Sequence, residues 1–341
     1  MKKFFKKNSG KKNLLVILTT WSRGKNLPDI VQSIVNQTYS DYTVFICDDC
    51  SPDNPEKIVE KIQKQHRNVD IRYFRNRTNV GEGLNIKFAL TRAFEYDFKY
   101  MVNFQDDNIY LDNHFFEDAI NSLEENPDAI YCAGLFQRWG MKTDLLNPPP
   151  DAPDQKIFKV NGIDFWNNWG LFNFHWTACI FRYENFLKYN LSNFQRKDCW
   201  NGDSLTLLRL ALSGKVMIYN GVVMDLAYNQ GEWTYGKRFK DPIDAFVKEQ
   251  KYYELAADSA IKAGVSESIA DEWLLGHRVG LMKQTVQRIG NDKKNFQRLS
   301  EIVGDYDKRL PVILMNELFS ALSPLMTSIS PPPPVEKEET E

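Results

Sequence analysis

The sequence predicts an α/β fold built on a mostly parallel sheet, followed by a helical C-terminal part. Two observations lead to this prediction. Between residues 13 and 105, apolar segments typical of buried strands alternate with segments of helical periodicity, and from about residue 242 the patterns are helical only. Strands that alternate with helices are typical of a doubly wound sheet, because each helix returns the chain so that the next strand runs parallel to the last.

The alternating elements follow one another closely. The predicted strands are continuous apolar runs, as expected of strands buried on both faces, and they cover 13–21, 42–49, 69–76 and 100–105. The predicted helices place apolar side chains on one face and cover 27–39, 55–66 and 83–95. Pro28 suits the first turn of the first helix, because the N–H that proline lacks has no partner there.

The pattern loosens after residue 130. A proline-rich stretch at 147–154 predicts a loop. Residues 174–190 predict a strand and then a helix, and residues 202–224 predict a helix that stops at Gly214 and then a strand. The later helices are predicted over 242–264, 268–290 and a segment centred on 310–326.

Composition excludes several classes of protein. The formal net charge of -2 gives no support to a nucleic-acid binder. No apolar run approaches the roughly 20 residues that span a bilayer, and no apolar segment follows the basic start as a secretory signal requires. The five scattered cysteines do not suggest a disulfide framework. We therefore expect a cytoplasmic protein.

Polar side chains collect at the ends of three predicted strands, in Thr19-Thr20-Trp21, Asp48-Asp49 and Asp106-Asp107. In doubly wound sheets, ligands bind beyond the carboxyl ends of the strands. Adjacent carboxylates repel each other and resist burial. The pair at 106–107 is therefore either an ordinary exit from a strand or a paired site for a cation, and the residues alone leave both interpretations open.

Several motifs occur in order along the chain: "VILTTWSR", "LPDIVQSIVNQTYSDYTVFICDDCSPDN", "NVGEGLNIKFAL" and "QDDN". This pattern resembles the family 2 glycosyltransferases of the GT-A fold over about residues 13–225, and "DDNIYL" is similar to the spore-coat polysaccharide glycosyltransferases of that family. The resemblance and the composition together predict four parts of the chain: a basic flexible N-terminus (1–12), a GT-A domain (13–235), a helical region (236–328) and a disordered tail (329–341).

The resemblance also implies a nucleotide site at the strand ends. Asp49 matches the carboxylate that accepts the N3–H of uracil or thymine, and Trp21 replaces a tyrosine that stacks on the base. Asp106 matches the residue that faces the ribose. The remaining nucleotide-binding candidates are Thr19, Thr20, Arg23, Arg77 and Gly81.

A divalent cation, Mn²⁺ or Mg²⁺, is implied at Asp107, which matches the carboxylate that ligates the metal against the donor diphosphate. Gln105 stands where the family has the first acid of its D-x-D motif. For the family's histidine ligand only His277 lies beyond the general base, and the helical pattern predicts it at a helix surface. The family pattern thus predicts a weakly bound metal with an unassigned third ligand.

The segment "CWNGDSLTLLRLALSGK" resembles an acidic motif of the family, in which Asp203 matches the general base. Without the resemblance, Asp203 is a first-turn acid that favours the helix dipole. Asp198 is the next candidate for the base. Six of the eight tryptophans lie between 139 and 233. Most are expected to form a bulky core, and some are candidates for flat platforms for a sugar ring. The acceptor or sugar candidates are His175, Trp176 and Trp200.

These features predict an inverting glycosyltransferase that moves a sugar from a UDP- or dTDP-linked donor to a hydroxyl acceptor, in glycan or polysaccharide biosynthesis. One alternative is a catalytically inactive sugar-nucleotide or glycan-binding module, suggested by Gln105. Another is a nucleotidyltransferase, disfavoured because no glycine-rich phosphate loop follows the first strand. The apolar segment 311–326 predicts a buried helix or one that forms a homodimer contact or, second, a peripheral contact with the inner face of a membrane.

Overall fold

The computed structural model describes residues 13–138, 143–148, 150, 153–169, 174–190, 202–226, 241–290 and 292–316. The predicted segments 1–12 and 329–341, the predicted domain boundary at 235 and the candidates Asp198 and Trp200 lie outside these residues.

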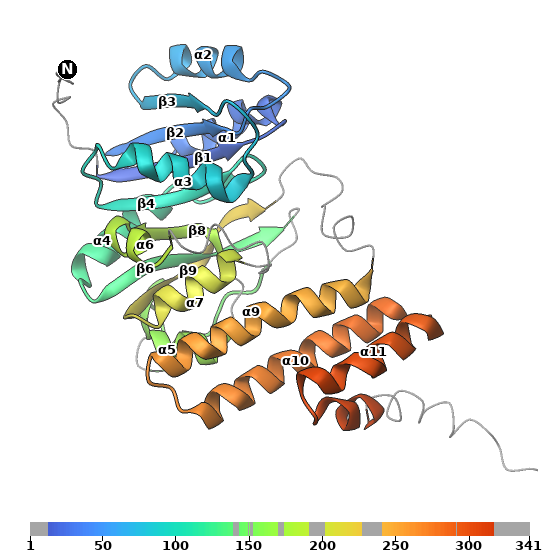
Figure 1. Ribbon diagram of the computed structural model, residues 1–341. Coiled ribbons are helices and arrows are strands. Elements are labelled where there is room, and N and C mark those ends of the chain that lie inside the picture. The colour runs from blue at the N-terminus through green and yellow to red at the C-terminus, as the bar shows by residue number, and fades with distance from the viewer. Residues whose placement is uncertain are drawn as a thin grey trace, which may run out of the picture.

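Four parallel strands form the N-terminal half of the sheet in the order β3-β2-β1-β4 (Figure 1). Their bounds are β1 Leu14–Thr20, β2 Tyr42–Asp48, β3 Asp70–Arg75 and β4 Tyr100–Gln105. Every residue of β1 and β2 is buried, which explains their unbroken apolar runs. The register places Thr20 beside Asp48 and Thr19 beside Gln105. The carboxyl ends of β1, β2 and β4 therefore meet at one edge of the sheet.

The sheet continues beyond β4 with strands of mixed direction. β8 (Phe174–Arg182) pairs antiparallel with β4, and β6 (Ala129–Arg138) pairs antiparallel with β8. β9 (Lys215–Leu226) runs parallel to β6 and pairs antiparallel with both β5 (Ile109–Tyr110) and β7 (Ile157–Asn161).

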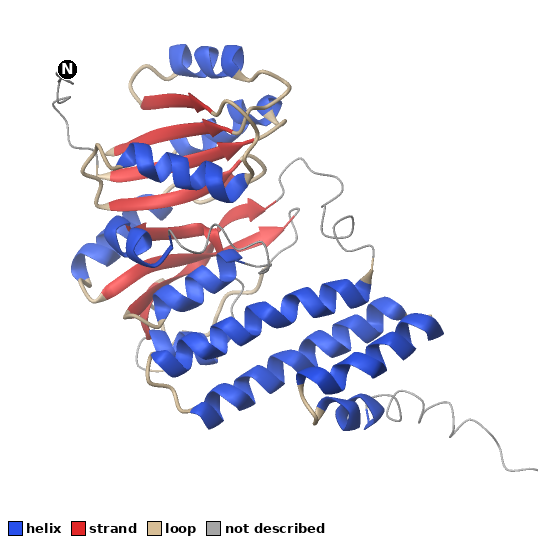
Figure 2. Ribbon diagram, in the orientation of Figure 1, coloured by secondary structure: helices blue, strands red, loops and turns tan. Residues whose placement is uncertain are grey.

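Helices cover both faces of this sheet (Figure 2). One face carries α1 (Leu27–Val35), α2 (Glu56–Gln65) and α4 (Phe115–Glu125), and the other carries α3 (Glu82–Ala93), α5 (Gly162–Asn167), α6 (Tyr183–Asn190) and α7 (Gly202–Ala211). Successive side chains of a strand point to opposite faces. Val16 accordingly packs in the first of these cores, whereas Leu15 and Ile17 pack in the second.

Three long helices form the C-terminal part: α9 (Pro242–Lys262), α10 (Glu267–Ile289) and α11 (Lys293–Tyr306). Asp241, Ser266 and Asp292 cap their N-termini by accepting backbone N–H hydrogen bonds. The three helices share a core of their own, and α9 also packs against the sheet side through α7. Within the described residues, no helix combines the length and the apolar character that crossing a membrane requires.

The structure confirms the predicted fold class, an α/β fold with a mostly parallel sheet flanked by helices and a helical C-terminal part. Sequence patterns missed α4, β6 and α11. In β6, Gly134 lies so close to β9 that a Cβ atom there would come within 2.6 Å of the Val223 side chain. A glycine that close strand packing requires interrupts the apolar pattern by which a strand is usually predicted.

Candidate active site

The two aspartates that follow β4 have different surroundings. Asp106 is buried, and its carboxylate accepts hydrogen bonds from the Trp21 backbone N–H at 2.9 Å and from Arg23 Nη1 at 2.8 Å. The Asn26 side-chain amide donates to the Asp106 carbonyl oxygen at 3.1 Å. Asp106 thereby fixes the loop after β1 against the end of β4. Its contact with a ribose stays a prediction.

Asp107 is the more open of the two, with 17% of its side chain exposed. Arg23 Nη1 lies 3.4 Å from its Oδ2 atom. Burial raises the pKa of the Asp107 carboxyl, Arg23 opposes this increase, and the neighbouring charge of Asp106 adds to it. The carboxylate thus lies where additional positive charge would stabilise its ionised form.

A divalent cation fits Asp107 as one of its ligands. No group of three or more His, Cys, Asp or Glu side chains in the described part of the chain is arranged to hold a metal. A hard cation such as Mg²⁺ or Mn²⁺ needs few protein ligands when waters and phosphate oxygens supply the others. Its charge would also offset the repulsion between Asp106 and Asp107. The residues therefore fit a cation that binds together with a diphosphate, and the third protein ligand stays unassigned.

The acids at the end of β2 also differ from each other. Asp48 is fully buried. Its carboxylate accepts hydrogen bonds from the Tyr73 hydroxyl and from Arg75, both at 2.6 Å. A third hydrogen bond comes from the Ser51 backbone N–H at 2.8 Å. These partners give Asp48 a structural role, because they tie β2, β3 and the turn after β2 together.

Asp49 holds the loop that leads into α3. Its Oδ1 atom accepts hydrogen bonds from Asn76 Nδ2 at 3.0 Å and the Val80 N–H at 2.9 Å, and its Oδ2 atom accepts the Gly81 N–H at 2.7 Å. Gly81 has a φ of +85°, which favours glycine. A carboxylate has room for about four hydrogen bonds, so one position remains for the N–H of a base. That Asp49 reads the base stays a prediction.

Trp21 presents an open aromatic surface beside these acids, since 52% of the residue is exposed. Arg23, two residues further on, is half-buried and points at Asp106 and Asp107. By contrast, Thr19 and Thr20 are buried, and the Thr19 hydroxyl donates to the Phe104 carbonyl oxygen at 3.4 Å. Arg77 is exposed near the end of β3. The geometry therefore singles out Trp21 and Arg23 as the accessible nucleotide-binding candidates after β1.

Asp203, in the first turn of α7, pairs with His175 at the start of β8. His175 Nε2 lies 3.1 Å from Asp203 Oδ2, and His175 Nδ1 lies 2.6 Å from the Thr177 hydroxyl oxygen. Burial alone would raise the pKa of Asp203. The hydrogen bond and charge of His175, with backbone N–H groups at the start of the helix, outweigh burial and lower this pKa below 3.8. Asp203 is therefore ionised at neutral pH, as a general base must be.

The other acceptor and sugar candidates are less accessible. Trp176 is 6% exposed and packs in the core between the sheet and α7. It therefore offers no open face to a sugar in this structure. His175 keeps 22% of its side chain exposed.

Glu82 is a residue that the sequence analysis missed. It is the first residue of α3, and its Oε1 atom accepts a hydrogen bond from the Gln105 side chain at the end of β4. Glu82 lies at the surface, but the protein atoms around its carboxylate displace water and raise its pKa; the hydrogen bond from Gln105 opposes this increase, and the charges of Asp203 and Asp107 add to it. No local signal identifies this acid, because a glutamate in the first turn of a helix is ordinary.

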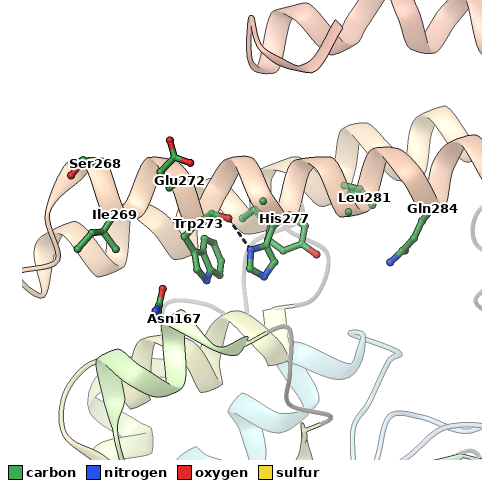
Figure 3. Close-up of a pocket in the computed structure, with 11 residues that line it drawn as sticks. Asn167, Ser268, Ile269, Glu272, Trp273, His277, Leu281 and Gln284 are labelled. Atoms are coloured by element: carbon green, nitrogen blue, oxygen red, sulfur yellow. Dashed lines mark hydrogen bonds between the residues drawn. The ribbon is translucent and has the colours of Figure 1, made fainter. Parts of the chain in front are cut away.

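A separate cavity of about 800 Å³ lies along α10, away from the strand ends (Figure 3). Figure 3 shows Trp273 and His277 pointing from α10 toward Asn167. His277, which the sequence predicts at the helix surface, is half-buried between Trp273 and Tyr253, with ring centroids 4.0 and 4.9 Å away. Burial lowers its pKa. His277 is thus committed to this helix packing.

The mostly parallel sheet, with acids and the exposed Trp21 at the carboxyl ends of its strands, is of the class of α/β enzymes that bind ligands at this edge. A family model described as Glycosyl transferase family 2 matches residues 15–189, which is more than half of the chain. The protein belongs to glycosyl transferase family 2.

Solved structures share the fold. TarS 1–349 from S. aureus in complex with UDP-GlcNAc superposes with a TM-score of 0.64 at 16% identity, over 92% of this chain and 86% of that chain. The mannosyltransferase PcManGT from Pyrobaculum calidifontis, in complex with GDP-Man and Mn²⁺, gives a TM-score of 0.56 at 14% identity, over 94% and 83% of the two chains. No curated protein matches the chain.

Proposed function

We propose that this glycosyltransferase transfers a sugar from a UDP- or dTDP-linked donor to a hydroxyl acceptor, with inversion at the anomeric carbon. The observation that supports this proposal most directly is the ionised Asp203, whose Oδ2 atom lies 3.1 Å from His175 Nε2. His175 also lowers the pKa of Asp107, so the base and the strand-end acids lie within electrostatic range of one another. In a displacement with inversion, the base that activates the acceptor hydroxyl and the groups that hold the donor diphosphate lie on opposite sides of the transferred sugar.

The reaction is a single displacement. Asp203 accepts the proton of the acceptor hydroxyl while that oxygen attacks the anomeric carbon from the face opposite the diphosphate. The bond between the anomeric carbon and the diphosphate oxygen breaks as the new bond forms, and the configuration inverts. Arg23 supplies positive charge near the departing diphosphate. A bound Mn²⁺ or Mg²⁺ would add further positive charge there.

The preference for uracil or thymine rests on Asp49, which has one acceptor position left, and on the motif resemblance. The S. aureus TarS complexes with UDP and UDP-GlcNAc support a uridine donor, while the GDP-Man complex of PcManGT shows that the fold also accepts guanosine donors. We keep the UDP or dTDP assignment because the motif resemblance at Asp49 implies uracil or thymine, and because a carboxylate accepts the N3–H of these bases and cannot pair in this way with cytosine N3.

A cytoplasmic role in glycan or polysaccharide biosynthesis belongs to the same proposal and rests on the donor chemistry. The similarity of "DDNIYL" to spore-coat glycosyltransferases gains no support from the comparisons and adds nothing to the proposal.

The test is a thermal-shift and transfer assay with UDP-, dTDP-, GDP- and CDP-linked sugars, with Mn²⁺ or with EDTA. We expect UDP or dTDP compounds to stabilise the protein, CDP compounds to have little effect, and EDTA to weaken both binding and transfer. Asp107→Asn should remove the effect of Mn²⁺. If EDTA changes neither binding nor transfer, the acids at 106–107 are structural. If no donor is turned over although UDP binds, the protein is a non-catalytic binding module.

A further inference from the structure

Glu82 lies at the candidate active site and has no part in the mechanism above. Its Oε1 atom accepts the amide N–H of Gln105, the residue directly before Asp106 and Asp107. The orientation of Gln105 is set from its other side, because Asn108 Nδ2 lies 3.5 Å from Gln105 Oε1. Gln105 therefore holds the Glu82 carboxylate against the end of β4.

The second carboxylate oxygen of Glu82 is open to a ligand. The residue is exposed to solvent, and within the described residues its Oε2 atom has no hydrogen-bond partner. Gly81, just before it, is anchored through its N–H to Asp49 at 2.7 Å. The position of Glu82 is thus fixed at two points, by Asp49 through the backbone and by Gln105 through the side chain. A fixed, open carboxylate is suited to recognising a hydroxyl group, because its side chain loses little conformational entropy on binding.

Glu82 lies between the two ends of the site. Its charge acts on Arg23, which contacts Asp106 and Asp107 at the proposed diphosphate end. The charges of Asp203 and His175, at the proposed acceptor end, act in turn on Glu82. The hydrogen bond from Gln105 fixes Glu82 beside Asp106 and Asp107, and its interaction with the charges of Asp203 and His175 indicates that the same carboxylate faces the acceptor end. In the proposed displacement the transferred sugar occupies that space.

We propose that Glu82 is a specificity-determining residue that accepts a hydrogen bond from a hydroxyl of a neutral donor sugar and disfavours donors whose sugar carries a carboxylate. This inference rests on the proposed function. A hydroxyl that donates to a carboxylate forms one of the stronger hydrogen bonds in proteins. A uronic acid would instead bring a further negative charge close to Glu82, Asp107 and Asp203, and like charges in a confined site reject a ligand.

The experiment compares the affinities of UDP, UDP-glucose and UDP-glucuronic acid by calorimetry in the presence of Mn²⁺. The proteins are the unaltered chain, Glu82→Gln and the control Glu267→Gln. Glu267 is a matched control because it is also an exposed first-turn glutamate, at the start of α10. The unaltered chain should prefer UDP-glucose over UDP-glucuronic acid by about 10–100-fold, the worth of one charge-assisted hydrogen bond.

Glu82→Gln should reduce this preference at least tenfold while UDP binds as before, and Glu267→Gln should leave all three affinities unchanged. Glu82→Asp, which keeps the charge, should retain a preference for the neutral sugar. An unchanged preference in Glu82→Gln overturns the inference. So does an equal loss for all three ligands, which would make Glu82 a diphosphate or metal residue.

The proposed function fails in a different way. If UDP does not bind the unaltered chain, the uridine assignment is wrong, and GDP-mannose and GDP-mannuronic acid then form the same neutral and acidic pair for testing Glu82.

Discussion

Replacing Asp203 by asparagine separates a catalytic role from a structural one. Asparagine keeps an oxygen that accepts the hydrogen bond from His175 Nε2, which is 3.1 Å long in the structure. The hydrogen bond becomes neutral, and the loss of folding free energy should stay within about 0.5–1.5 kcal/mol. The proton acceptor itself disappears. We expect turnover to fall by roughly 10²–10⁴-fold, the usual contribution of a general base, or about 3–5 kcal/mol of activation free energy.

The assay is UDP release with a donor and acceptor that the unaltered chain uses, together with UDP affinity and thermal unfolding of both proteins. Because the pKa of Asp203 is lowered on folding, its charge contributes stability above the unfolded value of about 3.9, and this contribution is lost as pH falls through the folded pKa. Any difference in melting temperature between the two proteins should therefore shrink below about pH 3.9.

Two results would contradict this reasoning. Near-normal turnover in Asp203→Asn would place the base elsewhere, and Glu82 and Asp198 would be the next acids to test. Loss of UDP binding or of the folded state would mean that Asp203 only stabilises the N-terminus of α7.

Three further changes test the surroundings of the site. His175→Ala should shift the acid limb of the kcat/KM profile to higher pH, because the hydrogen bond that lowers the pKa of Asp203 is removed; an unmoved limb would mean that His175 does not tune the base. Trp21→Ala should weaken UDP binding by about 1–3 kcal/mol, measured by calorimetry, and unchanged affinity would rule out stacking. Asp48→Asn should lower the free energy of unfolding by about 1.5–3 kcal/mol in denaturant titrations, because it weakens buried hydrogen bonds to a charged group. The control Asp70→Asn, at the part-exposed pair with Arg72, should cost at most about 1 kcal/mol, and equal losses would mean that burial does not matter at Asp48.

The parallel half of the sheet was predictable because its strands are buried on both faces. β1 and β2 expose no residue, so their sequences show the unbroken apolar runs from which they were predicted. The later strands were harder, since β6 has register shifts against both neighbours and contains a glycine that close packing with β9 requires. α11 was missed although Phe296, Leu299 and Val303 recur at helical spacing; of its residues only Leu299 and Val303 are buried.

The candidate site could likewise be predicted only in part from local sequence patterns. Sequence motifs pointed to Asp49, Asp106, Asp107 and Asp203, because each follows a predicted strand or starts a predicted helix. The partner of each carboxylate could not be read from the sequence. Asp106 binds the backbone of residue 21, Asp203 binds His175, and Glu82 binds Gln105, so each contact depends on how distant elements pack.

The adjacent acids of each strand end have different hydrogen-bond partners. At β2, Asp48 is fully buried and accepts three hydrogen bonds, from Tyr73, Arg75 and the Ser51 N–H. Asp49 is also buried and accepts three, from the segment that leads into α3. At β4, Asp106 is bound to the loop after β1, while Asp107 stays partly open and repelled by its neighbour. At β4 the first acid stabilises the edge of the sheet, and the second is the more accessible to a ligand. At β2 both acids are buried and hold neighbouring segments of the chain, so a base would have to use the fourth acceptor position of Asp49.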